Sequence, residues 1–301
     1  MKKTVIYAVI CAVLLLLAVL AVKNALTDDV PGSPGGEVIP VSGSDASKDY
    51  PFQVYFADVW QGDGIVIKNK NVFIVVDGGD SDHSYAVTGI LDSLGAKDIE
   101  LYIATHPHSD HIGAAGDIFE KYNVKNVMMT SFSEFNTPTT ITYEKLLSAV
   151  ENEKCGVILA TAGDSFTYGD MKLDVFSPSE ETAEYNNMSI VFKLTCGKTR
   201  FLFTGDAEKA VDEQLLASDF DLGADVLKIA HHGGSDATSK QFLEAVSPKT
   251  AVISCGKNND YGHPHRETLK LLESEDIEVL RTDERGDITI FSDGKNIFVK
   301  E

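Results

Sequence analysis

Cysteine and positive charge are both scarce in this sequence. Four of the 301 residues are cysteine and none forms a Cys-x-x-Cys pair, so a small disulfide scaffold is excluded. Lysine and arginine number 26 against 46 acidic residues, a net charge of −20 without a basic stripe. A chain this acidic has no overall electrostatic attraction to nucleic acid or anionic lipid. We expect Cys196 and Cys255 to be buried free thiols, and a disulfide among Cys155, Cys196 and Cys255 stays open.

Long apolar runs are also rare, apart from one at the N-terminus. Thr4–Val22 holds 19 residues without a charge, directly after Lys2 and Lys3. As a helix it would span roughly 28 Å, close to the thickness of the hydrocarbon core of a bilayer. Residues 1–22 are therefore predicted to be a signal anchor or a cleavable signal peptide, with a buried core helix as the alternative. The basic start favours a cytoplasmic N-terminus, which predicts a single-pass membrane protein with its domain outside, or a secreted protein if the signal is cleaved.

The rest of the chain divides into a linker and one domain. Residues 23–50 are rich in Pro, Gly, Ser and Asp and predict a flexible linker. Residues 51–301 alternate strand-like and helix-like segments. Val72–Val76 is strand-like, Ser84–Leu94 has helical spacing, and Leu101–Thr105 is again strand-like. This alternation predicts a layered α/β or α+β fold.

A group of potential metal ligands directly follows the predicted strand Leu101–Thr105. Imidazole and carboxylate are the ligands that borderline divalent metals prefer, and a loop at the end of a strand can direct several side chains to one point. Four such residues are too many for one tetrahedral ion bound by one loop, so the segment predicts two metals. The four residues are His106, His108, Asp110 and His111.

This segment resembles the central motif of the metallo-β-lactamase fold hydrolases. Five further segments resemble motifs of the competence-protein (ComEC-type) branch of that superfamily, and all six occur in the expected order within residues 51–301. The resemblance implies a four-layer αββα sandwich with the metal site at one edge of two facing sheets. The five further segments are Asp58–Asp63 (DVWQGD), Ile74–Gly79 (IVVDGG), Phe201–Asp206 (FLFTGD), Leu227–Gly233 (LKIAHHG) and the late His-Pro motif Tyr261–His265 (YGHPH).

The resemblance also implies the roles of the ligands. His106 and His108 would bind metal 1, Asp110 and His111 would bind metal 2, and Asp206 would bridge both. Two divalent ions are expected, zinc first, with manganese or iron also open because oxygen-rich sites suit them.

The last ligand of each metal is less well defined by the resemblance. His231 would complete metal 2, and His232 is its rival or a residue that holds a ligand in place. The superfamily usually supplies another histidine to metal 1, but no histidine lies between His111 and His231. Tyr185–Ser189 stands there instead and resembles the Asn-x-Ser of the ComEC-type branch, so metal 1 is expected to bind more weakly, with water or an Asn oxygen.

Two aspartates of the early motifs have two interpretations. Asp63 and Asp77 are most simply turn residues. The alternative is that they hold the metal-binding histidines in place.

The expected function is metal-dependent hydrolysis of phosphoester or phosphodiester bonds, in DNA or in smaller diesters. A hydroxide activated by two metals would attack, Asp110 would orient it, and His263 or His232 would protonate the leaving group. A catalytically weak or inactive metal-containing binding module of the cell envelope is the alternative. The expected partners are a phosphate-containing substrate and, through residues 4–22, the membrane; the sequence contains no readable protein-binding motif.

Overall fold

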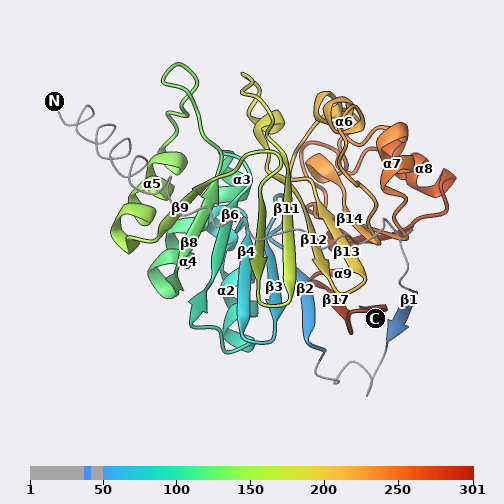
Figure 1. Ribbon diagram of the computed structural model, residues 1–301, viewed down its shortest axis with the longest axis horizontal. Coiled ribbons are helices and arrows are strands. Elements are labelled where there is room, and N and C mark those ends of the chain that lie inside the picture. Colours follow the sequence, from blue (N-terminus) through green and yellow to red (C-terminus); the bar gives the residue numbers. More distant parts are fainter. Residues whose placement is uncertain (1–36, 42–49) are drawn as a thin grey trace. The chain divides into compact units, whose positions relative to one another are not determined.

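A computed structural model describes residues 37–41 and 50–301 (Figure 1). These residues belong to one compact unit, Ser33–Glu301. The predicted segment 1–22 and most of the predicted linker lie outside the described residues. Within the described ranges, no helix combines the length and the apolar content needed to cross a membrane.

Two large sheets form the centre of the fold. The first has nine strands in the order β1-β18-β17-β2-β3-β4-β6-β8-β9, and the second has seven in the order β10 to β16. The strands of the first sheet are β1 (Val38–Val41), β2 (Phe52–Phe56), β3 (Ile65–Asn69), β4 (Val72–Val76), β6 (Leu101–Ala104), β8 (Asn126–Met129), β9 (Gly156–Leu159), β17 (Ile288–Ser292) and β18 (Ile297–Lys300).

The second sheet begins antiparallel and continues parallel. β10 to β13 pair antiparallel, whereas β13 to β16 pair parallel. A short two-stranded sheet joins β5 (Asp98–Ile99) to β7 (Asn123–Val124). The strands of the second sheet are β10 (Ser165–Tyr168), β11 (Met171–Ser177), β12 (Val191–Cys196), β13 (Thr199–Phe203), β14 (Val226–Lys228), β15 (Thr250–Ile253) and β16 (Glu278–Arg281).

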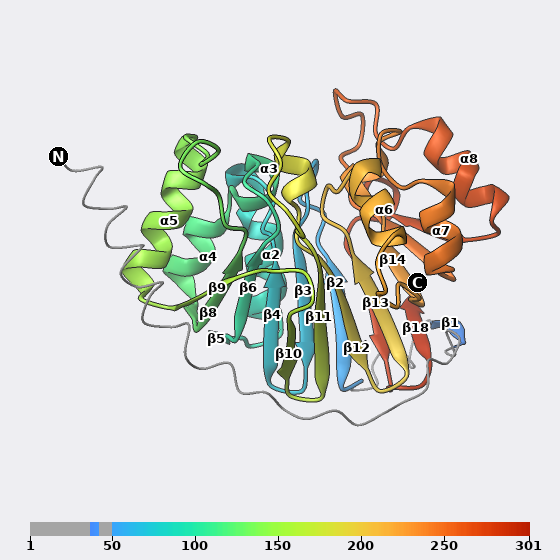
Figure 2. The same ribbon diagram turned by 45° about the horizontal axis from the view of Figure 1, so that its top comes forward.

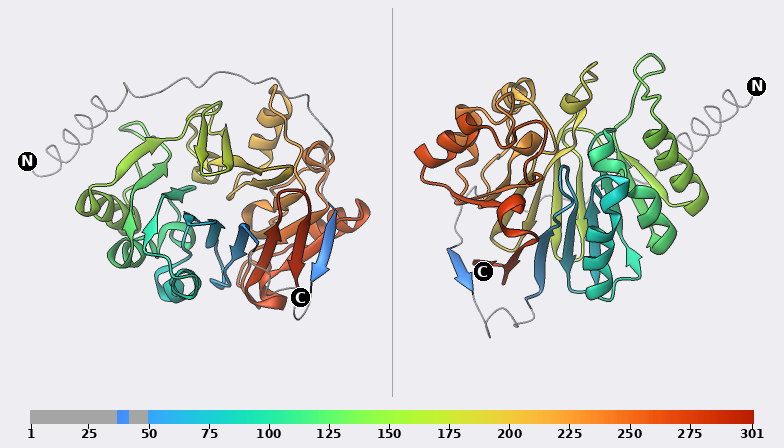
Figure 3. Two further views of the ribbon diagram at one scale, coloured as in Figure 1. Left: turned by 60° about the horizontal axis from the view of Figure 1, so that its bottom comes forward. Right: turned by 180° about the vertical axis from the view of Figure 1, so that it is seen from behind.

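Helices cover the outer face of each sheet (Figures 2 and 3). One buried cluster contains residues of the first sheet together with α2, α4 and α5, and another contains residues of the second sheet together with α6, α7 and α8. The helices are α2 (Ser84–Ser93), α3 (Ser109–Ile112), α4 (Ala115–Lys121), α5 (Ile141–Glu153), α6 (Lys209–Leu216), α7 (Lys240–Val246), α8 (Arg266–Ser274) and α9 (Thr282–Arg285), with 3-10 turns η2 (Ser81–His83), η3 (Tyr185–Met188) and η4 (Ala230–Gly233).

The third and largest cluster lies between the two sheets. Phe52 and Phe56 of the first sheet pack against Phe201 and Phe203 of the second, with ring centroids 5.2 and 6.3 Å apart. Burial of these aromatic rings contributes to the favourable free energy of folding. The order helices, sheet, sheet, helices is the layered α/β arrangement that the sequence predicts.

Three differences from the sequence-based expectation concern less obvious elements. Val38–Val41 lies inside the predicted linker but forms β1, which pairs in parallel with β18. Val38 packs against the cluster between the two sheets, and Ile39 and Val41 pack with Tyr50 and Phe291, which favours the pairing. Glu278–Arg281 forms β16, which the sequence analysis missed, and Asp110 and His111 lie on the short helix α3 rather than in an open loop.

The described cysteines are unpaired. Cys196 and Cys255 are buried free thiols, as predicted, and Cys155 is a half-buried free thiol. No disulfide therefore joins these three residues.

Candidate metal centre

The predicted ligands come from strand ends that meet at one edge of the sandwich. β4, β6 and β8 run parallel, as do β13, β14 and β15, so the carboxyl ends of each set lie at the same edge of its sheet. His106 and α3 follow β6, Asp206 follows β13, and η4 follows β14. In Figure 2, α3 lies at this upper edge, with α4 and α5 to its left and α6, α7 and α8 to its right.

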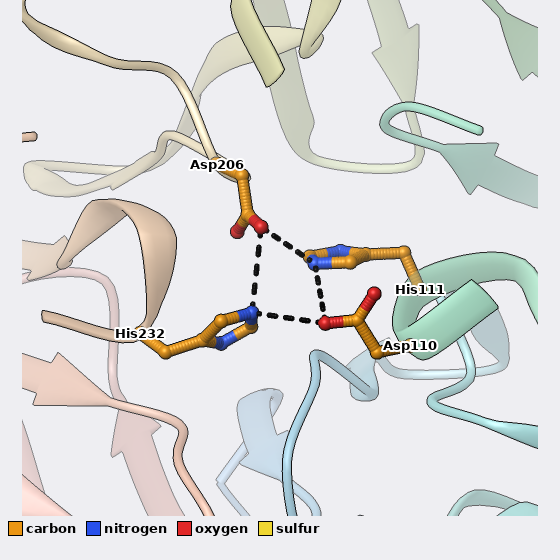
Figure 4. A group of neighbouring side chains, drawn as sticks. All are labelled: Asp110, His111, Asp206 and His232. Atoms are coloured by element: carbon orange, nitrogen blue, oxygen red, sulfur yellow. Dashed lines mark ion pairs between the residues drawn. The ribbon is translucent and has the colours of Figure 1, made fainter. Parts of the chain in front are cut away.

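Four side chains from segments that follow strands of both sheets converge there (Figure 4). Asp110, His111, Asp206 and His232 each present a ligand atom within 4.8 Å of the others. Asp206 Oδ2 lies 3.2 Å from His111 Nε2 and 3.4 Å from His232 Nε2. Asp110 Oδ2 lies 3.4 Å from His232 Nε2. We call these four residues the first ligand group.

A second ligand group shares one of these residues. His106, His108 and Asp206 also present ligand atoms within 4.8 Å of one another. Asp206 Oδ2 lies 3.7 Å from His106 Nε2, and His106 Nε2 lies 3.0 Å from His108 Nδ1. The Asp206 carboxylate thus stands between the two groups, the place that the sequence analysis expects for a bridging ligand.

The structure places His232, and not His231, in the first ligand group. His231 lies instead with Glu208 and Asp236, its Nδ1 3.1 Å from Asp236 Oδ1. Both histidines adopt left-handed backbone conformations, with φ of 48° and 53°, and this unusual turn directs only His232 inward. His232 Nδ1 lies 2.9 Å from the Ser254 carbonyl oxygen, which leaves Nε2 facing Asp110 and Asp206.

Asp77 holds His111 in place. Its carboxylate lies 2.8 Å from His111 Nδ1 and accepts hydrogen bonds from the Thr105 hydroxyl and backbone N–H. An Nδ1–H bound to a carboxylate presents Nε2 to a metal. Of the two interpretations of Asp77, the structure therefore supports the holding role. Burial raises the pKa of Asp77, against the opposing effect of His111.

The second ligand group has weaker support from its surroundings. The neutral Thr105 hydroxyl lies 3.2 Å from His106 Nδ1, where His111 Nδ1 has the Asp77 carboxylate. Asn186 and Asn187 lie in η3, the turn after β11. Their side-chain amides donate hydrogen bonds to the Glu208 carboxylate. Asn187 Oδ1 accepts from the Glu208 backbone N–H. That oxygen is therefore engaged elsewhere, whereas Asn186 Oδ1 is buried without a hydrogen-bond partner.

His263 lies beside the first ligand group. Its ring centroid is 6.2 Å from that of His232 and 5.3 Å from that of His231. Burial, together with the charge of His232, lowers the pKa of His263 to about 4. This lowered pKa favours the neutral ring at neutral pH, a form that can donate a hydrogen bond to a leaving group.

The buried polar atoms of the first ligand group fit a divalent ion. His111 Nε2, His232 Nε2 and Asp206 Oδ1 are buried without a hydrogen-bond partner, a costly arrangement unless a ligand binds them. Two imidazoles with two carboxylates form the mixed nitrogen and oxygen set that zinc, manganese and iron accept.

Comparison with known proteins agrees with this geometry. The model of the metallo-beta-lactamase superfamily matches residues 57–257. The chain belongs to the metallo-β-lactamase superfamily. The resemblance expected from the sequence motifs is thereby confirmed, and the ligand groups lie within the matched residues.

Competence proteins are among the relatives. The chain is 36% identical over 199 residues to ComE operon protein 3 of Bacillus subtilis, a match that covers 66% of this chain and 25% of that protein. It is 34% identical over 227 residues to Recombination protein 2 of Haemophilus influenzae, covering 73% and 26%. It is 28% identical to Competence protein ComA of Neisseria gonorrhoeae, covering 76% and 30%. The chain thus spans between 25% and 30% of these relatives' lengths.

Solved structures share the fold at low sequence identity. The fold is similar to the metallo-beta-lactamase fold protein YhfI of Bacillus subtilis, with a TM-score of 0.52, 13% identity and coverage of 76% of this chain and 96% of that one. It is also similar to CmlA, a diiron beta-hydroxylase of Streptomyces venezuelae, with a TM-score of 0.56, 10% identity and coverage of 82% and 55%. These similarities establish a mixed α/β metallo-β-lactamase fold.

Proposed function

We propose that this protein is a metal-dependent hydrolase of phosphoester or phosphodiester bonds, with DNA and smaller diesters as the candidate substrates. The observation that carries the proposal is the pair of ligand groups that share Asp206. Membership of a superfamily of metallo-hydrolases supports the reaction type. The names of the relatives refer to competence and recombination, which favours DNA among the diesters.

The two ligand groups would bind two divalent ions. The first ligand group would bind one ion, His106 and His108 would bind the other, and Asp206 would contact both. Bound divalent ions would polarise the phosphoryl oxygens and make water a stronger acid.

Asp110 has a further role in this proposal. Burial alone would raise its pKa, but His232 and His111 lower the pKa of Asp110 far below its usual value. The carboxylate therefore remains ionised and can accept a hydrogen bond from the attacking water. His263, neutral and half-buried beside His232, can donate a hydrogen bond to the leaving oxygen.

The decisive test combines metal analysis with turnover. The purified full-length chain would be analysed for bound metal, then assayed with bis-p-nitrophenyl phosphate and with linear DNA in added zinc or manganese. We expect bound divalent metal and hydrolysis that Asp110→Ala removes. A protein that binds no metal would overturn the proposal, and hydrolysis of DNA but not of the small ester would identify a nuclease.

A second candidate function has its own supporting observation. The second ligand group has only two histidines besides the shared Asp206, so its ion would bind too weakly for catalysis and leave a binding module. One tightly bound metal per chain, with no turnover of either substrate at saturating metal, would favour this reading.

The location is also a proposal. We infer that residues 4–22 lie in a membrane and that the domain lies on its outer side, because an uncharged run follows Lys2 and Lys3. Protease added to intact cells should then digest the domain. Protection of the domain until the cells are lysed would contradict the inferred side.

A further inference from the structure

A buried ion pair connects the two sheets next to the first ligand group. Lys228 ends β14 in the second sheet, and Asp63 lies in the loop between β2 and β3 of the first sheet. Lys228 Nζ lies 2.8 Å from Asp63 Oδ1, and both side chains are at most 2% exposed. We call Lys228 and Asp63 the cross-sheet ion pair.

The cross-sheet ion pair contacts a metal-facing residue from each half. The Asp63 backbone N–H donates to the Asp110 carbonyl oxygen at 3.2 Å. Asp63 Oδ1 also lies 3.8 Å from His232 Nδ1. Asp110 belongs to the half containing the first sheet, and His232 to the half containing the second.

The loop that holds Asp63 packs tightly on Asp110. Gly62 has a φ of 141°, and a Cβ there would lie 2.1 Å from the Asp110 carbonyl oxygen. The Gly79 backbone N–H donates to the Asp63 carbonyl oxygen at 2.7 Å. A shift of Asp63 would therefore be transmitted to Asp110 by backbone contact, because no space separates the two segments.

A buried ion pair is weak evidence for stability, since apolar residues of similar volume often stabilise a fold equally well or better. The cross-sheet ion pair matters here because it fixes the relative position of the two sheets. Four ligands from two sheets must stand at fixed separations, and the pair joins those sheets beside them. Lys228 also donates to the Ile229 carbonyl oxygen at 2.9 Å, so its ammonium has a fixed position.

We propose that Lys228 is a positioning residue for metal binding, which acts through Asp63 to hold Asp110 and His232 at the separation that one divalent ion requires. The inference rests on the proposed function only in taking the first ligand group as a metal site. Removal of groups that orient metal ligands typically lowers metal affinity by about 10- to 100-fold, and the same loss is expected here.

The test measures metal binding by Lys228→Met in the full-length chain without substrate. Calorimetry with Mn²⁺ and with Zn²⁺ should show the tighter site weakened by about 10- to 100-fold. The rise in melting temperature on adding metal should shrink accordingly, because that rise reports affinity for the folded state. Lys228→Arg, which keeps the charge, should recover part of the affinity.

Lys193 offers a matched control. It is also a buried lysine of the second sheet, 3.1 Å from Asp221, and it contacts neither ligand group. Lys193→Met should lower the melting temperature of the metal-free protein but leave metal affinity unchanged. Equal affinity in Lys228→Met and the wild type, or equal loss in both lysine variants, would overturn the inference.

Lys228→Met leaves the Asp63 carboxylate buried and unpaired, which can prevent folding. The double variant Asp63→Asn/Lys228→Met removes both charges and should fold. Its metal affinity should still be about tenfold below the wild type, and wild-type affinity in this variant would refute the positioning role. A wild type that binds no metal would instead refute the proposed function.

Discussion

The two ligand groups share Asp206 but differ in what surrounds them. The first has two carboxylates and two imidazoles, and Asp77, Ser254 and Asp63 contact its members. The second has two histidines, of which His106 contacts the neutral Thr105 hydroxyl, and the Asn186 and Asn187 amides bind Glu208 instead. Metal affinity depends on such supporting contacts as well as on the ligands. We therefore expect tight binding at the first group and weak binding at the second.

Asp206→Asn should have the largest effect, because it alters both groups at once. We expect loss of both metals and a fall in diester hydrolysis of about a thousandfold, equivalent to about 4 kcal/mol of transition-state stabilisation. Metal analysis and initial rates would check this. Asp212→Asn, a buried aspartate of α6 that accepts from the Ser239 N–H, is the control and should retain both.

Asp110→Ala should separate the two groups. The first group would lose a ligand, so the tight phase of a metal titration should vanish while a weak phase at His106 and His108 persists. Hydrolysis should fall below detection with the fold intact by circular dichroism. Loss of both phases would show that the two ligand groups do not bind metal independently, and would contradict the difference in affinity expected between them.

Asp77→Asn should weaken the first group without removing a ligand. The amide can still contact Thr105, but it no longer fixes the proton on His111 Nδ1, so metal affinity should fall by about 10- to 100-fold. Asp225→Asn provides a control, since Asp225 is buried at the other end of β14 and accepts from the Arg200 N–H. Unchanged affinity in Asp77→Asn would assign Asp77 to folding alone.

Proton release should distinguish the groups more subtly. Burial lowers the pKa values of His106 and His108. Burial would also lower that of His232, but Asp206 and Asp110 raise the pKa of His232 to about 9. Burial would likewise lower the pKa of His111, but Asp206 and Asp77 raise it well above its usual value. At pH 7 a metal must therefore displace protons from His232 and His111 but none from His106.

The affinity of the first group should consequently rise between pH 7 and 9, by about tenfold per unit for each proton released. The affinity of the second group should stay nearly constant over that range. Calorimetry in two buffers of different ionisation enthalpy would count the protons. Equal proton release in both binding phases would contradict the assignment.

Much of this metal centre can be predicted from the sequence because several of its ligands lie close together in the chain. Four potential ligands fall within six residues after one strand, and the spacing alone predicts their convergence. Asp206 lies far away in the chain and was placed by resemblance to a motif. The same resemblance favours His231 as the last ligand, with His232 as its rival, whereas the structure places His232 in the first ligand group, because two left-handed residues in succession direct only that side chain inward.

Features that depend on packing between distant segments were harder to predict. The sequence leaves the role of Asp77 open because its partner, His111, lies 34 residues further along the chain. The contact between Lys228 and Asp63 crosses two sheets and has no local pattern. β16 has charged residues at both ends and β1 lies in a Pro- and Gly-rich stretch, so neither shows a clear alternation.

β1 has a consequence for how copies of the protein meet. It pairs with β18 and occupies one end of the nine-stranded sheet, where an uncovered strand would offer its backbone groups to another molecule. Pro40 lies within β1 and lacks an N–H, which makes this outermost strand a poor template for further addition. A shortened chain that starts at Tyr50 would expose β18 and tend to self-associate, whereas one that starts at Glu37 would retain this protection.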